Sequence, residues 1–190
     1  MSIKKLIIFV DRGDIARAPI AAAIVSQNLN ERNLQNLYSV ISFRTQGYAP
    51  DDKEPIKFPN ITYYRKQYLD SERWLNEHNI DLSSRWSTAI NSWFAEKAKV
   101  IFAMDTKTRR SLLLMFPNCE GKVHTFSEIV REVKEIDDPE FAEDRQGLEQ
   151  IYNGIENTIV NGFPRLLSLT DGINVKNLET ADTYPRKEQK

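Results

Sequence analysis

The stretch Leu6-Ile-Ile-Phe-Val-Asp11-Arg-Gly-Asp-Ile-Ala-Arg-Ala-Pro19 decides the fold of this chain. It opens with a continuous β-branched and aromatic run without alternation, which is typical of a strand buried on both faces of a parallel sheet. A polar turn follows, and Pro19 then opens an alanine-rich segment that reaches Leu29. Proline fits the first turn of a helix, where its missing N–H would have no partner anyway. The stretch therefore predicts a strand, a tight turn and a helix.

The alternation of strands and helices continues along the chain. Apolar and β-branched runs predict further strands at residues 38–45, 99–104 and 122–126. Apolar spacings of three and four residues and the positions of proline predict helices at residues 69–78, 92–98, 106–115 and 147–169. Residues 48–66 are expected to be irregular, and residues 170–190 to form a polar C-terminal tail.

Strands that alternate with helices imply a parallel sheet covered on both faces. We therefore predict a single three-layer α/β domain over residues 1–169, with a small parallel sheet flanked by helices. In such sheets ligands bind at the carboxyl ends of the strands, beside the N-terminus of the following helix. The turn after Val10 is therefore the candidate site.

Composition narrows the class of protein. The chain has 190 residues, with 26 Lys and Arg against 27 Asp and Glu, so no basic field exists to attract nucleic acid or an anionic membrane. The apolar run Leu6–Val10 is too short for a secretory signal or a membrane span. A single cysteine, Cys119, rules out an internal disulfide framework and points to a reducing compartment. We expect a cytoplasmic protein that binds neither nucleic acid nor membranes.

The turn resembles the phosphate loop of the low-molecular-weight protein tyrosine phosphatases. That family has a strand followed by Cys-x-Gly-Asn-x-Cys-Arg-Ser-Pro and a helix. Here the corresponding residues are Asp11-Arg-Gly-Asp-Ile-Ala-Arg-Ala-Pro19. The family's glycine, arginine and proline are kept as Gly13, Arg17 and Pro19. Its first cysteine, asparagine, second cysteine and serine are replaced by Asp11, Asp14, Ala16 and Ala18.

Four more fragments resemble the family and occur in the family's order. They are Thr45-Gln-Gly47 for Ser-Ala-Gly, Asn79-Ile-Asp-Leu-Ser-Ser-Arg85 for Gly-Ile-Asp-Leu-Ser-x-Arg, Met104-Asp105, and Asp138-Pro139. The resemblance spans about residues 4–169 and implies a phosphotyrosine-phosphatase-I-like fold.

The resemblance also implies which residues would hold phosphate. Backbone N–H groups of a tight loop at a helix N-terminus can cradle the anion, and an arginine fork can bind two of its oxygens. The corresponding residues here are Arg12, Gly13, Asp14, Ile15, Ala16, Arg17 and Ala18. In the family the first cysteine attacks phosphorus as a thiolate, and the aspartate of Asp-Pro, here Asp138, protonates the leaving oxygen.

Asp11 is a poor replacement for the thiolate. As a nucleophile it would form an acyl phosphate, chemistry that generally recruits Mg²⁺. Alternatively, its carboxylate accepts hydrogen bonds from the loop's own N–H groups as an internal anion, or contacts a metal or ligand. Asp14 adds a like charge, which at about 4 Å costs on the order of 4 kcal/mol at an effective dielectric of about 20. We therefore expect weak binding of phosphate or phosphotyrosine, with Arg17 pairing to Asp11 or Asp14.

A metal site is a further alternative for the acidic residues. Asp11, Asp14 and Asp138 would converge if the fold is correct, and three carboxylates can hold Mg²⁺ or Ca²⁺. Arg12 and Arg17 lie among them, however, so we expect neither a metal nor another cofactor. Cys119 follows Pro117-Asn118 in a loop remote from the motif and is expected to be an incidental thiol.

These residues favour a catalytically inactive, phosphatase-like protein that acts as a binding or regulatory module for a protein partner. One alternative is an active phosphomonoester hydrolase that uses Asp11 with a divalent metal. The other is a structural subunit of a complex, docked through residues 48–66 and the tail.

Overall fold

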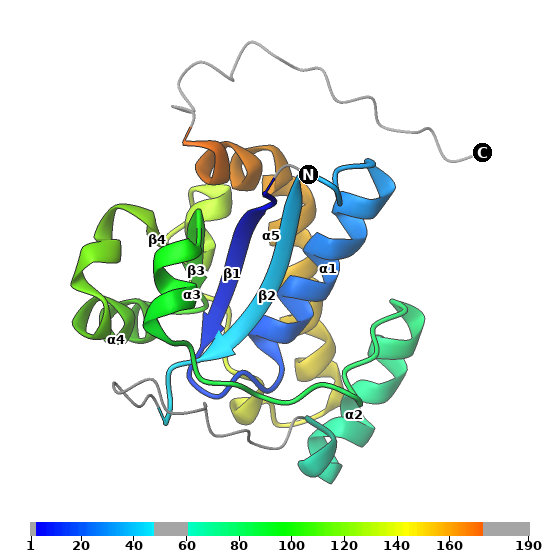
Figure 1. Cartoon of the computed structure of the whole chain (residues 1–190). Coiled ribbons are helices and arrows are strands. Elements are labelled where there is room, and N and C mark those ends of the chain that lie inside the picture. Colours follow the sequence, from blue (N-terminus) through cyan, green and yellow to red (C-terminus); the bar gives the residue numbers. More distant parts are fainter. Residues whose placement is uncertain (1–2, 48–60, 173–190) are drawn as a thin grey trace.

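The computed structural model describes residues 3–47 and 61–172 of the chain. Its elements are β1 (Lys5–Asp11), α1 (Arg17–Glu31), β2 (Tyr38–Arg44), η1 (Ile61–Tyr63), α2 (Arg65–Glu77), α3 (Ser92–Lys97), β3 (Val100–Ala103), α4 (Thr106–Met115), η2 (Pro117–Lys122), β4 (Val123–Thr125), η3 (Phe126–Val130), η4 (Pro139–Phe141) and α5 (Arg145–Asp171), where η denotes a 3₁₀ helix. Figure 1 shows the strands enclosed between helices. The predicted α/β fold is confirmed.

The four strands form one parallel sheet in the order β2-β1-β3-β4. β1 lies in the interior and pairs along its whole length with β2, from Lys5 opposite Tyr38 to Asp11 opposite Arg44. Its other edge pairs with β3, and the carbonyl of Val10 accepts the N–H of Met104. The carboxyl ends of β1, β2 and β3 therefore meet at one edge of the sheet, where the chain enters the candidate loop.

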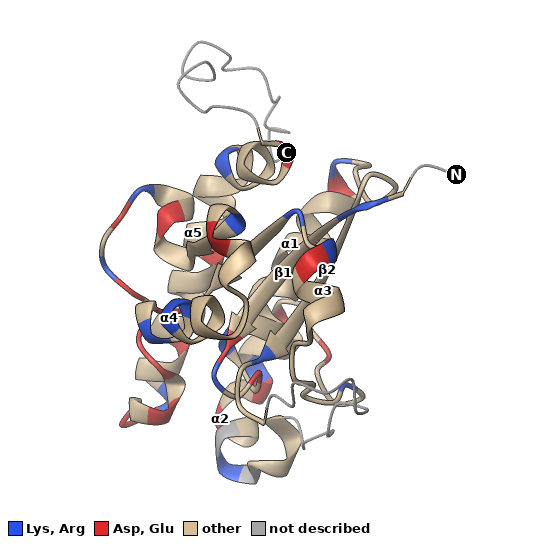
Figure 2. Ribbon diagram, turned by 60° about the vertical axis from the view of Figure 1, so that its left-hand side comes forward, with Lys and Arg blue, Asp and Glu red and all other residues tan. Residues whose placement is uncertain are grey.

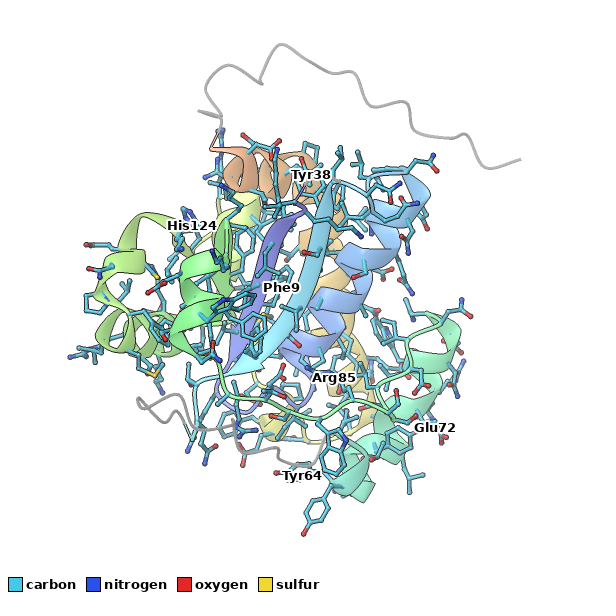
Figure 3. All side chains as sticks on the ribbon, in the orientation of Figure 1. Phe9, Tyr38, Tyr64, Glu72, Arg85 and His124 are labelled. Carbon is cyan, nitrogen blue, oxygen red and sulfur yellow. The ribbon has the colours of Figure 1, made fainter. Side chains whose placement is uncertain are left out.

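Each face of the sheet has its own apolar core, which explains the lack of alternation in β1. Ile7 and Phe9 point to the face that packs against α1 and α5. Ile8 and Val10 point to the opposite face, in a cluster that includes residues of α3 and α4. All four side chains are fully buried. Phe9, labelled at the centre of Figure 3, stacks on Phe102 of the neighbouring strand with ring centroids 5.5 Å apart.

Several helix boundaries differ from those predicted. α1 begins at Arg17 rather than Pro19, so the proline still lies in the first turn. α2 begins at Arg65 rather than at residue 69, because the buried Ile61 anchors a 3₁₀ turn just before it. Residues 61–66 are therefore ordered into η1 and α2 rather than irregular. Residues 48–60 lie outside the described residues.

α5 continues two residues past the predicted end at Leu169, so the tail does not begin at Thr170. Thr170 is buried, and its hydroxyl donates to the carbonyl of Leu166. The carboxylate of Asp171 accepts bonds from Lys5 Nζ at 2.7 Å and from the Tyr38 hydroxyl at 2.9 Å. These contacts tie the end of the helix to the amino ends of β1 and β2, and the left-handed Gly172 follows. Residues 173–190 of the expected tail lie outside the described residues.

No helix within residues 3–47 and 61–172 has both the length and the hydropathy that crossing a membrane requires.

Candidate functional site

The candidate loop connects the end of β1 at Asp11 to the start of α1 at Arg17. Its left-handed residue is Asp14, with φ 52°, a conformation that aspartate and asparagine tolerate better than other non-glycine residues. Gly13 is not in the left-handed conformation. Its missing side chain leaves room for Ile15, because a Cβ at this position would lie 3.1 Å from Ile15 Cδ1. Ser87 of the segment before α3 fixes the loop by donating its hydroxyl to the carbonyl of Gly13 at 2.7 Å. The loop is thus shaped by Asp14 and held from outside.

Asp11 and Arg17 form a buried, two-point ion pair at the base of the loop. Arg17 Nε donates to Asp11 Oδ2 at 3.1 Å, and Arg17 Nη2 donates to Asp11 Oδ1 at 2.7 Å. The backbone N–H of Arg12 also donates to Asp11 Oδ1, at 2.7 Å. Asp11 is 6% exposed and Arg17 is 3% exposed, so water screens this pair weakly. The carboxylate of Asp11 therefore occupies the guanidinium fork of Arg17.

Two further carboxylates converge on the same guanidinium. Arg17 Nη2 donates to Asp105 Oδ2 at 2.9 Å and to Asp138 Oδ2 at 3.0 Å. Each of these aspartates also caps a helix, because Asp105 accepts the N–H of Thr108 and Asp138 accepts that of Glu140. Arg17 Nη1 donates to the carbonyl of Ile136 at 3.2 Å. One cation therefore joins β1, the start of α4 and the start of η4.

The pKa directions follow from this crowding. Burial raises the pKa of Asp11, although Arg17 opposes the shift. For Arg17, burial alone would lower the pKa, but Asp11, Asp138 and Asp105 outweigh it, so the pKa is raised. For Asp105, the bonds from Thr108 and the charge of Arg17 outweigh burial and lower the pKa. The charged form of Asp11 is thus held at a desolvation cost that Arg17 offsets only in part.

Asp14 belongs to a second ion pair, in which the aspartate is buried and the Arg85 side chain is partly exposed. Arg85 Nη2 donates to Asp14 Oδ2 at 2.7 Å and to Ser42 Oγ at 2.8 Å, and Arg85 Nη1 donates to the carbonyl of Asp14. Asp14 is fully buried, and among the described residues its Oδ1 has no hydrogen-bond partner. Burial raises the pKa of Asp14 to about 6, against the opposing charge of Arg85. Figure 3 shows Arg85 beside the carboxyl end of β2, and Arg85 belongs to the segment that connects α2 to α3.

The structure brings together most of the residues that the sequence suggested. Asp11, Arg17 and Asp138 meet, and Arg17 pairs with Asp11 as expected. The alternative prediction, that Arg17 pairs with Asp14, is wrong, because the carboxylate of Asp14 pairs with Arg85. The loop N–H groups contribute less to Asp11 than expected, since Arg12 supplies the backbone bond found among the described residues. Of the other loop residues, Arg12 is exposed, Gly13 and Ile15 are half-buried, and Ala16 and Ala18 are buried.

Sequence reasoning missed the roles of Asp105 and Arg85. Both stood in fragments that resemble the family, Met104-Asp105 and Asn79–Arg85, yet neither fragment indicated an ion pair with the loop. Arg44 was missed as well. It is 2% exposed, donates to the carbonyls of Gln46 and Ser87, and has a pKa lowered by burial and partly restored by Asp14. The sequence signal that could have indicated a buried role for Arg44 was its position as a charged residue at the end of a buried strand.

No cluster of three or more His, Cys, Asp or Glu side chains within the described residues is arranged to hold a metal ion. The point where Asp11, Asp105 and Asp138 converge is occupied by the Arg17 guanidinium. Figure 2 shows acidic and basic segments distributed over all parts of the fold, including the region near the lower ends of the strands.

Cys119 lies in η2, away from the loop. It is buried in the core cluster on the α3 and α4 side, and its thiol contacts the carbonyl of Ala95 at 3.6 Å. Burial raises the pKa of this thiol, which disfavours the reactive thiolate.

Comparison with known proteins agrees with this architecture. Residues 64–168, more than half of the chain, match the family described as low molecular weight phosphotyrosine protein phosphatase. The Asp11–Pro19 loop lies outside that match. No curated protein sequence matches the chain.

Solved structures resemble the whole domain. The low molecular weight protein tyrosine phosphatase from T. tengcongensis aligns with a TM-score of 0.68 at 19% identity, covering 85% of this chain and 99% of that one. The YwlE arginine phosphatase from Geobacillus stearothermophilus aligns with a TM-score of 0.63 at 18% identity, covering 95% and 99%. A phosphotyrosine phosphatase from Vibrio cholerae O395 gives 0.67 at 16% identity, covering 86% and 97%. At these identities the likeness establishes the fold.

Proposed function

Because this chain belongs to the low molecular weight phosphotyrosine protein phosphatase family, we propose that it is a catalytically inactive member that acts as a protein-binding or regulatory module. One observation carries the proposal. Asp11, in the position of the family's nucleophile, is bound at two points by Arg17, the arginine that matches the family's phosphate-binding residue. In this proposal, the ion pair between Asp11 and Arg17 replaces both the nucleophile and the anion-binding site of the family.

The charges around Arg17 support weak binding of phosphate. A phosphate dianion would have to displace Asp11 from the guanidinium fork while Asp105 and Asp138 remain in contact with it. One added like charge at about 4 Å costs on the order of 4 kcal/mol at an effective dielectric of about 20. Because three carboxylates already surround one guanidinium, a dianion would bring a surplus of negative charge into a buried site.

The chemistry of Asp11 supports weak nucleophilicity. Hydrogen bonds lower the nucleophilicity of a carboxylate oxygen, and both oxygens of Asp11 accept them, Oδ2 from Arg17 and Oδ1 from Arg17 and Arg12. The aspartate that matches the family's general acid, Asp138, pairs with Arg17 as well.

Turnover of an aryl phosphate tests the proposal. The names of the similar structures add phosphotyrosine and phosphoarginine peptides as further substrates to assay. We expect no hydrolysis above buffer with or without Mg²⁺, and the same result for Asp11→Asn. Hydrolysis by the parent chain that disappears in Asp11→Asn would overturn the proposal. It would favour the rival, a hydrolase in which Asp11 forms an acyl phosphate that hydroxylamine can trap.

A further inference from the structure

A groove of about 840 Å³ lies between residues 127–144 and one face of α5. Asp138 lines it, so the groove adjoins the degenerate loop through the contact between Asp138 and Arg17. The groove is thus next to the candidate site but is built from other residues. No residue of the loop Arg12–Ala18 lines it.

One wall of the groove is strongly acidic. Six carboxylates line it against one ammonium group, that of Lys134. Three of the six have structural partners, since Glu135 accepts the N–H of Thr106 and Asp138 and Asp144 cap η4 and α5. The other three are exposed and form no ion pair with any residue of the described ranges: Glu132, Asp137 and Glu143. These three carboxylates are available to a cation from outside.

The opposite wall is a polar face of α5. Side-chain amides and small residues recur along it at spacings of three and four: Gln146, Gln150, Gly154, Asn157 and Asn161. At about 1.5 Å of rise per residue the two ends of this face lie about 22 Å apart, and Ile136 packs close to Gly154 between them. That length matches roughly seven residues of an extended peptide. Amide side chains can donate to and accept from the main chain of such a segment.

The groove also offers apolar surface. Ile136 and Ile151 are half-buried, and Phe141 at the end of η4 is 79% exposed. A partner of the matching chemistry would place basic side chains on the acidic wall and an aliphatic side chain against these residues. A small inorganic cation would use only the carboxylates and leave the amide face unexplained.

We propose that this groove binds an extended basic segment of a partner protein. Its lysine or arginine side chains pair with Glu132, Asp137 and Glu143, and its main chain lies along the amide face of α5. The inference rests on the part of the proposed function that makes the chain a protein-binding module, and it does not depend on whether the Asp11 loop is inactive.

Fluorescence anisotropy with a labelled peptide of four Arg-Ala-Leu repeats tests the groove, with four Glu-Ala-Leu repeats as the opposite charge pattern. We expect the full chain to bind the basic peptide and not the acidic one. Substituting Glu132→Gln, Asp137→Asn and Glu143→Gln together should weaken binding by about tenfold or more, because each exposed pair is worth up to about 1 kcal/mol. Raising the salt concentration should weaken binding in the parent.

A matched triple variant separates the groove from net charge. Glu31→Gln, Glu96→Gln and Glu120→Gln remove the same charge from exposed positions outside the groove. They should leave binding within about twofold of the parent. If both triple variants lose the same affinity for the basic peptide, the proposal that the groove binds it is wrong. The same holds if the parent shows no preference for the basic peptide at low salt.

A further substitution, Asn157→Lys, places a cation on the amide wall and should also weaken binding of the basic peptide. Unchanged binding would contradict the placement of the peptide along α5.

The aryl phosphate assay on the same proteins distinguishes the peptide-binding proposal from the proposal of catalytic inactivity. Turnover of the aryl phosphate would contradict the proposal that the chain is inactive and would leave the peptide-binding proposal unaffected. A lack of peptide binding would contradict the peptide-binding proposal and would say nothing about activity.

Discussion

The carboxylate of Asp11 and the guanidinium of Arg17 form two hydrogen bonds, at 3.1 Å from Nε and 2.7 Å from Nη2, in a site where both side chains are nearly inaccessible to water. An internal anion thus occupies the guanidinium fork of Arg17. The opposite charges of Asp11 and Arg17 neutralise each other within the loop. Several measurable properties of the chain depend on this pair and on the neighbouring pair of Asp14 and Arg85.

Neutralising Asp11 should open the anion site. In Asp11→Asn the Arg17 fork loses its strongest competitor, and the repulsion between Asp11 and an incoming phosphate disappears. We expect isothermal titration calorimetry to show inorganic phosphate binding at least about tenfold more tightly than to the parent. Asp81→Asn, at an exposed position, is the control and should leave phosphate binding unchanged. Equal affinities for Asp11→Asn and parent would mean that Asp11 does not obstruct the site.

Removing Arg17 should destabilise the fold severely. Arg17→Leu leaves Asp11 buried with no opposing charge and releases Asp105 and Asp138. The free energy of unfolding measured in urea should fall by about 3–5 kcal/mol. Arg73→Leu, which breaks an exposed pair with Glu77, should change it by less than about 1 kcal/mol. Adding Asp11→Asn to Arg17→Leu should recover part of the loss, and a double variant no more stable than Arg17→Leu would argue against a buried-charge penalty.

Asp14 should make stability depend on pH. Its pKa is about 6 in the folded chain against an ordinary value of 3.8. Between roughly pH 4 and pH 6 the folded chain retains a proton that the unfolded chain releases, so this group's contribution to stability falls as pH rises through that window. Relative to the parent, Asp14→Asn should therefore gain stability from pH 4 to pH 7, on the order of 1–3 kcal/mol. A constant difference between the two urea curves over this range would contradict an ionising, buried Asp14.

The packing of α5 against η3 should tolerate no side chain at Gly162. A Cβ there would lie 2.3 Å from Ile129 Cγ2 and 2.7 Å from the Ile129 carbonyl oxygen. Gly162→Ala should lower the free energy of unfolding by about 1–3 kcal/mol, despite the better helix propensity of alanine. The control is Gly121→Ala, where nothing lies within 4 Å of the added Cβ. Thermal melts that shift equally for both variants would show that the close contact is relieved without cost.

The fold was predictable because its determinants are local. The uninterrupted run Leu6–Val10 is apolar on both sides of the strand, and the structure buries both sides. The N-terminus and length of α4 follow from Asp105 as a cap and from Pro117 beyond its end. The end of α5 was not predictable in this way. It is stabilised by contacts of Asp171 with Lys5 and Tyr38, which lie more than a hundred residues earlier in the chain.

The candidate site likewise has features that the sequence predicted and features that depended on the tertiary structure. By itself the sequence determined where the loop lies and that Pro19 belongs to the first turn of the helix after it, because a strand–loop–helix unit is specified by neighbouring residues. Only the tertiary structure decided the pairing of the charges. Asp105, Asp138 and Arg85 approach from three separate segments, and a buried charge takes whichever opposite charge the packed fold brings within hydrogen-bond distance, whatever its separation in sequence.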